Sequence, residues 1–106
     1  WSIIHIKEEN NMKFSIDIDP KMEPIIAARL PGFYVDARGA YGIVFRDYYI
    51  CCFINSDDGS YDVTVDTISD EGDFDKNIVW DSYDDPNEAI ADLRYWLKAY
   101  RVMPLR

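Results

Sequence analysis

The carboxylates are the side chains of this sequence that could do chemistry, and they are concentrated in one segment. Thirteen of the twenty Asp and Glu residues lie between Asp57 and Asp92, where Lys76 is the only base, and the formal net charge of the chain is −9. Such a segment repels anions and attracts cationic partners. We therefore expect no direct binding to nucleic acid, and we expect a basic protein surface as the partner.

Five of these carboxylates are predicted to bind that partner. Two fall on the polar side of an alternating strand pattern over 61–68, and three lie in an acidic loop around Gly72. The predicted partner-binding residues are Asp62, Asp66, Asp70, Asp73 and Asp75. The competing interpretation is that the acids only cap helices, form turns and keep the sheet surface solvated.

Metal chemistry finds little support in the residue types and their spacing. A calcium loop that starts at Asp73 requires glycine and glutamate where this chain has Ile78 and Asp84. The two cysteines, Cys51 and Cys52, are adjacent and would point to opposite faces of a strand. We predict no metal site, no cofactor and no disulfide, with both thiols reduced in a cytoplasmic protein.

Catalytic signatures are also missing from the sequence. His5 is the only imidazole, and there is no nucleophile elbow or phosphate-binding loop. Acid–base catalysis would then require carboxylates whose pKa is shifted by burial. We assign no catalytic residue and predict a non-enzymatic interaction module. Two alternatives stay open: a small-ligand-binding domain with an apolar pocket lined by Tyr and Trp side chains, of which the chain has eight and three, and a carboxylate-dependent small enzyme.

The elements that must position these residues follow from hydrophobic periodicity. Alternating or apolar runs predict strands over 33–38, 41–47, 48–54, 61–68 and 78–83, with short turns between most of them. In the last strand we expect Trp80 to point inward. A further strand at the amino terminus would give six. The predicted fold class is α+β, with a mainly antiparallel sheet of five or six strands.

Two helices complete the predicted fold. A short helix is expected over 24–30, because Pro24 suits a first helical position and Pro31-Gly32 stops it. A longer helix is expected over 86–101, capped by Asp85 and carrying an apolar stripe at helical spacing. We expect this C-terminal helix to pack on one face of the sheet.

Size and composition predict a single folded domain over 1–106. The chain has 106 residues and 48% hydrophobic residues, and it contains no apolar run near the ~20 residues of a membrane span. Residues 1–11 form an N-terminal extension or an edge strand in this interpretation. Because the strand over 48–54 is apolar on both faces, a second subunit in a homodimer could close one of them. In general character the chain is similar to small acidic proteins of phages and mobile elements, which suggests an inhibitor or antitoxin-like protein, although no motif assigns a family.

Overall fold

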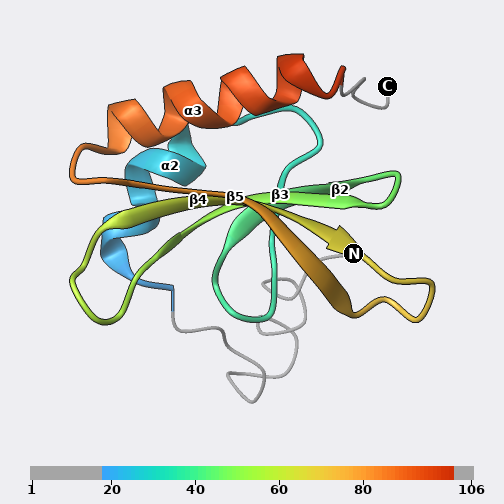
Figure 1. Cartoon of the computed structure of the whole chain (residues 1–106). Helices are drawn as coiled ribbons and strands as arrows, with labels where there is room; N and C mark the ends of the chain where they lie inside the picture. Colours follow the sequence, from blue (N-terminus) through green and yellow to red (C-terminus); the bar gives the residue numbers. More distant parts are fainter. Residues whose placement is uncertain (1–17, 102–106) are drawn as a thin grey trace, which may run out of the picture.

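The computed structural model describes residues 18–101 as an antiparallel sheet with helices against one face (Figure 1). The five strands follow one another in the sheet in the order β1-β2-β3-β4-β5. The elements are the 3-10 helix η1 (Pro20–Met22), α2 (Glu23–Ala27), β1 (Tyr34–Val35), β2 (Tyr41–Phe45), β3 (Tyr48–Ile54), β4 (Tyr61–Ile68), β5 (Phe74–Tyr83) and α3 (Pro86–Ala99). The predicted α+β fold is confirmed. The extension or strand expected over 1–11 lies outside the described residues.

Strand β3 forms the middle of the sheet, as its two apolar faces predicted. It pairs with β2 on one side and with β4 on the other, and its segment from Tyr49 to Cys52 is buried. On one face Ile50 and Cys52 join the main core, and on the other face Tyr49 and Cys51 form a second cluster with Ala40. The homodimer expected from this pattern stays a prediction.

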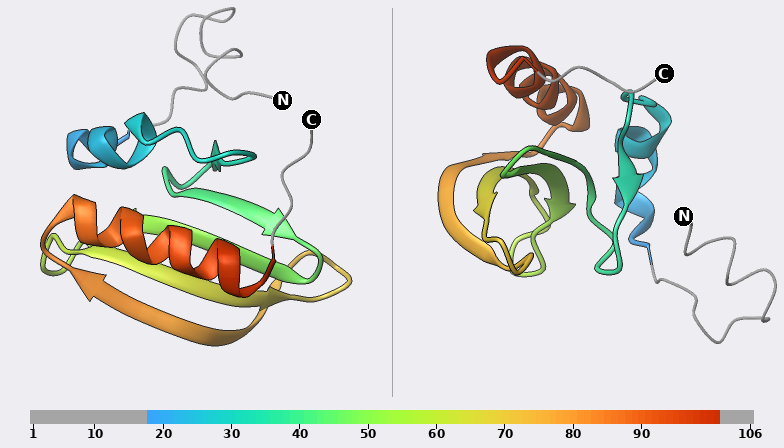
Figure 2. Two further views of the ribbon diagram at one scale, coloured as in Figure 1. Left: turned by 90° about the horizontal axis from the view of Figure 1, so that it is seen from above. Right: turned by 90° about the vertical axis from the view of Figure 1, so that its right-hand side faces the viewer.

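Helix α3 lies across β3 and β4 and supplies much of the main core (Figure 2). Its start is capped as predicted, because Asp85 Oδ1 accepts a hydrogen bond of 2.8 Å from the backbone N–H of Asn87. Ala89 and Leu93 face the sheet and are fully buried. The helix ends at Ala99, two residues before the predicted boundary.

The short helical segment begins earlier and ends earlier than the predicted 24–30. Asp19 Oδ1 accepts a hydrogen bond of 2.9 Å from the backbone N–H of Lys21 and starts η1, which continues into α2 at Glu23. Arg29 has a positive φ of 50°, which is incompatible with a continuing right-handed helix. Met22 and Ile25 anchor this segment in the main core.

Strand β5 differs most from its prediction. It starts at Phe74 instead of residue 78, since a tight turn pairs Phe74 with Ile68 and extends the ladder into the acidic segment. Two register irregularities interrupt this ladder around Asp66. The prediction that Trp80 points into the core is wrong: the register places Val79 opposite Val65 on the α3 face, and Trp80 faces away from the helix.

Candidate functional site

The β4–β5 hairpin gathers most of the predicted partner-binding residues in one place. We call residues 66–75 the acidic hairpin; its carboxylates are Asp66, Asp70, Glu71, Asp73 and Asp75. The hairpin projects beyond the sheet at the end opposite the start of α3 (Figure 1). Four of the predicted residues, Asp66, Asp70, Asp73 and Asp75, are therefore close neighbours on a single turn and its flanking strand ends.

Backbone hydrogen bonds hold the turn of the acidic hairpin. The N–H of Ser69 donates to the carbonyl of Asp73 at 2.8 Å, and the N–H of Gly72 donates to the carbonyl of Ser69 at 2.9 Å. Gly72 has a φ of 88°, a conformation that glycine adopts without strain. A β-carbon placed on Gly72 would meet nothing within 4 Å, so the outer side of the turn is open.

The carboxylates around this turn are exposed, and no cation of the described residues pairs with them. Within residues 18–101 the side chains of Asp70, Glu71, Asp73 and Asp75 make no hydrogen bond and no ion pair. Asp66 is partly buried and accepts a hydrogen bond of 2.9 Å from Asn77 Nδ2 across the hairpin. The acidic hairpin is thus a patch of largely unneutralised negative charge.

Asp62 lies elsewhere and has a different role. Its side chain is 0% exposed, and its carboxylate accepts hydrogen bonds from Asn55 Nδ2 at 2.9 Å, Ser60 Oγ at 2.6 Å, Trp80 Nε1 at 2.8 Å and Ser82 Oγ at 2.8 Å. Burial alone would raise the pKa of Asp62, but these hydrogen bonds outweigh it and lower the pKa. Asp62 is not accessible to a partner, and its prediction as a docking residue is corrected here.

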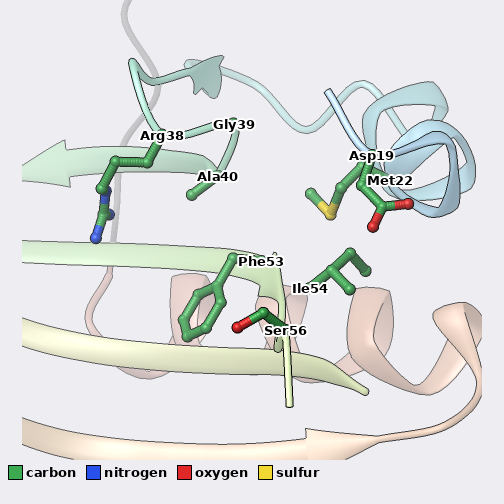
Figure 3. A pocket seen from close by; sticks show the side chains of 8 residues that line it. All are labelled: Asp19, Met22, Arg38, Gly39, Ala40, Phe53, Ile54 and Ser56. Atoms are coloured by element: carbon green, nitrogen blue, oxygen red, sulfur yellow. The ribbon is translucent and has the colours of Figure 1, made fainter. Parts of the chain in front are cut away.

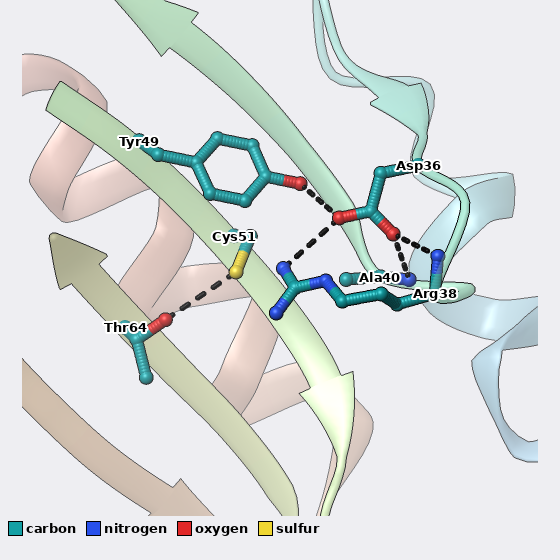
Figure 4. Close-up of polar contacts among 6 residues, drawn as sticks. All are labelled: Asp36, Arg38, Ala40, Tyr49, Cys51 and Thr64. Atoms are coloured by element: carbon teal, nitrogen blue, oxygen red, sulfur yellow. Dashed lines mark hydrogen bonds and ion pairs between the residues drawn. The ribbon is translucent and has the colours of Figure 1, made fainter. Parts of the chain in front are cut away.

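A second carboxylate, the partly buried Asp36, ties the turn before β2 to the centre of the sheet (Figure 4). Asp36 Oδ2 accepts hydrogen bonds from Tyr49 Oη at 2.6 Å and from the Arg38 guanidinium at 3.0 Å, while Oδ1 accepts from the N–H groups of Arg38 and Ala40. Burial opposes ionisation of Asp36, but these bonds outweigh it and lower its pKa. Because the Arg38 guanidinium is paired with this carboxylate, we interpret the cluster as structural.

The structure also brings together two carboxyl groups that sequence reasoning missed. Asp81 on β5 and Asp92 on α3 face each other between the sheet and the helix, and burial together with the neighbouring Asp81 raises the pKa of Asp92 to about 6. Asp92 Oδ2 and Trp96 Nε1 are buried without a hydrogen-bond partner. The signal was present, since Asp92 lies three residues after Ala89 and four before Trp96 on the apolar stripe of α3.

A hollow of about 320 Å³ lies between η1, the turn before β2 and the end of β3 (Figure 3). Its lining residues are Asp19, Met22, Arg38, Gly39, Ala40, Phe53, Ile54 and Ser56. A second hollow of about 470 Å³ runs along α2, from Ile18 to Arg29. Neither is lined by Tyr or Trp, and neither includes the Asp81–Asp92 pair, so these hollows support neither alternative function.

Residues 18–101 contain neither a metal-binding cluster of side chains nor a membrane-spanning helix. No group of three or more His, Cys, Asp or Glu side chains in this part of the chain is arranged to hold a metal ion. No helix within the same residues is both long enough and apolar enough to cross a membrane.

Comparison with known proteins gives no functional information. No protein family, no curated protein and no solved structure matches this chain.

Proposed function

We propose that this protein is a non-enzymatic interaction module that docks on a basic surface of a partner protein through the acidic hairpin. The observation that carries this proposal is the group of four exposed carboxylates on one turn, without a cation partner among residues 18–101. An inhibitor or antitoxin-like role fits such a module, because a partner's cationic functional surface would be covered on binding.

The charge arrangement suits recognition better than it suits stability. Like charges on one turn repel each other, which costs folding free energy, and among residues 18–101 no basic side chain forms an ion pair with these carboxylates. The same field accelerates encounter with a cationic surface and orients it. Because the carboxylates are exposed, added salt will screen this attraction over a Debye length of about 8 Å at physiological ionic strength.

The two cysteines provide the argument for location. Cys51 and Cys52 are both free and buried in the sheet, on opposite faces. Burial raises the pKa of the Cys51 thiol to about 11 and that of Cys52 to about 12, so both stay protonated near neutral pH. Free thiols are usual in a reducing compartment, and we propose a cytoplasmic location on that basis.

The proposal is tested by neutralising the acidic hairpin and measuring binding of a fluorescent oligolysine peptide at low and high salt. The hairpin variant carries Asp70→Asn, Glu71→Gln, Asp73→Asn and Asp75→Asn. A matched control neutralises four exposed carboxylates outside the hairpin, with Glu23→Gln, Asp57→Asn, Asp84→Asn and Glu88→Gln. Both variants change the net charge equally, so a difference between them reports on position.

We expect the hairpin variant to bind more weakly by about 2 kcal/mol, since each exposed ion pair contributes about 0.5 kcal/mol. This corresponds to roughly thirty-fold in Kd. The control variant should stay within about three-fold of the parent protein. Equal weakening of both variants would show that only net charge matters, and that result would overturn the proposed docking site.

A further inference from the structure

We propose that the partner segment binds as an extended basic strand added to the outer edge of β5, where no other strand of residues 18–101 pairs. This inference rests on the proposed function, because it specifies how the partner of the acidic hairpin is held. Strand addition uses main-chain hydrogen bonds for affinity and alternate side chains for specificity.

Strand β5 offers the edge that such a partner needs. It is the last strand in the sheet order, and among the described elements it pairs only with β4. It spans ten residues, which makes it the longest of the described strands, and all residues from Phe74 to Ile78 are exposed. From Val79 to Tyr83 the ladder with β4 is regular, so every second residue of this stretch directs its N–H and C=O groups away from the sheet, where a new strand can pair with them.

Three apolar side chains of β5 are exposed, and two of them reach over β4 to contact rings on β3. Phe74 is 54% exposed, Ile78 47% and Trp80 56%. The Phe74 ring stacks on Tyr49 with centroids 5.8 Å apart, and Trp80 meets Phe53 edge to face at 6.1 Å. The indole N–H of Trp80 is bonded to Asp62, which fixes the ring further. Because these two rings lie toward the middle of the sheet, Ile78 is the exposed apolar side chain of β5 that a strand added at the edge would contact.

The charge around β5 selects a basic occupant over a second copy of this chain. Residues 70–84 contain six Asp and Glu side chains and one lysine, Lys76. If two copies of β5 paired with each other, these carboxylates would face their counterparts, and like charges opposite one another destabilise a strand pair. A strand that alternates basic and apolar residues would instead place its cations near Asp73 and Asp75 and its apolar side chains near Ile78.

The test uses the full chain and a peptide of alternating lysine and valine, followed by amide hydrogen exchange measured by NMR. Peptide binding is expected to slow exchange at alternate amides of β5 by at least about ten-fold, because these amides gain hydrogen-bond partners. Amides of β4 should not change, because they are already paired on both sides. This readout needs no substitution, so it holds even if a variant fails to fold.

Two matched variants separate strand addition from simple charge attraction. Ile78→Glu adds a negative charge at the edge, and Val44→Glu adds the same charge at a residue of similar exposure on β2, 48% against 47%. Charge attraction alone predicts equal or tighter binding for both. Strand addition predicts that Ile78→Glu weakens binding by about five-fold, because an apolar contact is lost, while Val44→Glu does not.

The outcomes distinguish this inference from the proposal on which it rests. Salt-sensitive binding without protection of β5 amides would overturn strand addition and leave docking through the acidic hairpin standing. Absence of salt-sensitive binding would overturn both. Slow exchange, before any peptide is added, at the β5 amides that are not bonded to β4 would show that the edge is already occupied, by a second copy if the protection depends on protein concentration, and would also overturn the inference.

Discussion

Replacing Asp62 by alanine is expected to destabilise the protein severely, because its buried carboxylate is the common acceptor for four side chains. Hydrogen bonds to a charged group contribute about 1.5–3 kcal/mol each. The loss of these hydrogen bonds is partly offset, because alanine also removes the free-energy cost of burying the charge. We expect a net loss of about 3–5 kcal/mol in the free energy of unfolding, against a total of about 5–15 kcal/mol for a domain of this size.

Asp62→Asn provides a graded comparison. The amide oxygen can accept from Asn55 Nδ2 and Trp80 Nε1, which can only donate, while the amide nitrogen donates to the hydroxyls of Ser60 and Ser82, which can reverse their roles. We therefore expect a smaller loss of about 1–2 kcal/mol. Asp70→Asn, at an exposed residue of the acidic hairpin, serves as the control and should change stability by no more than about 0.5 kcal/mol.

Urea denaturation followed by circular dichroism, repeated across pH, measures these differences. The pKa of Asp62 is lower in the folded state than in the unfolded chain, where it is about 3.9. The stability that ionised Asp62 contributes is therefore fully present above the pKa of the unfolded state and is lost as pH falls through the pKa of the folded state. A loss below about 1 kcal/mol for Asp62→Ala near neutral pH, or a difference that grows toward acid pH, would refute the reasoning.

Two further predictions concern Asp92 of α3 and the two cysteines of β3. Because the pKa of Asp92 is raised to about 6 in the folded state, the free energy of unfolding should fall as pH rises from about 4 to about 6. In thermal melts across pH, Asp92→Asn should remove this slope and should be about 1 kcal/mol more stable than the parent near pH 7, after allowance for solvent screening. A variant less stable than the parent at that pH would contradict this prediction. The thiols of Cys51 and Cys52 are buried, and their pKa values are raised to about 11 and about 12. We expect both to resist iodoacetamide in the folded protein and to react in urea. Rapid alkylation of the folded protein, detected by mass spectrometry, would show instead that the thiols are accessible.

The sequence predicts best where local chemistry and periodicity agree. Helix α3 combines a capping aspartate, a proline at its first position and an apolar stripe, and its start is correct to the residue. Strand β3 is apolar on both faces, which only a central strand can satisfy, and the sheet order confirms it. In both cases the pattern depends on the segment itself and not on its distant neighbours.

The face assignments of β5 and of Asp62 required information that no single strand carries. In β5 the two alternating sets each contain apolar residues, Ile78 with Trp80 and Val79 with Tyr83, so periodicity does not choose between them. Pairing with β4 decides, because it places Val79 opposite Val65. Trp80 then lies on the same face as Asp62 and gives its indole N–H a buried acceptor there.

The candidate site was predictable only where its residues are neighbours in the sequence. Four of the five carboxylates of the acidic hairpin, Asp70, Glu71, Asp73 and Asp75, follow one another in sequence around a glycine turn, so their proximity is local. The pair of Asp81 and Asp92 depends on how α3 sits against β5, although each residue occupies the inward side of its own periodic pattern. Periodicity could have indicated both acids separately, but not that they meet.

The acidic hairpin as a docking site is the central claim, and NMR chemical-shift mapping on the isotopically labelled full chain tests it most directly. With oligolysine peptide added at low salt, we predict that shifts concentrate in residues 66–80 and fade as salt is raised. Shifts spread evenly over every exposed carboxylate, or centred on the hollow beside η1, would contradict the account.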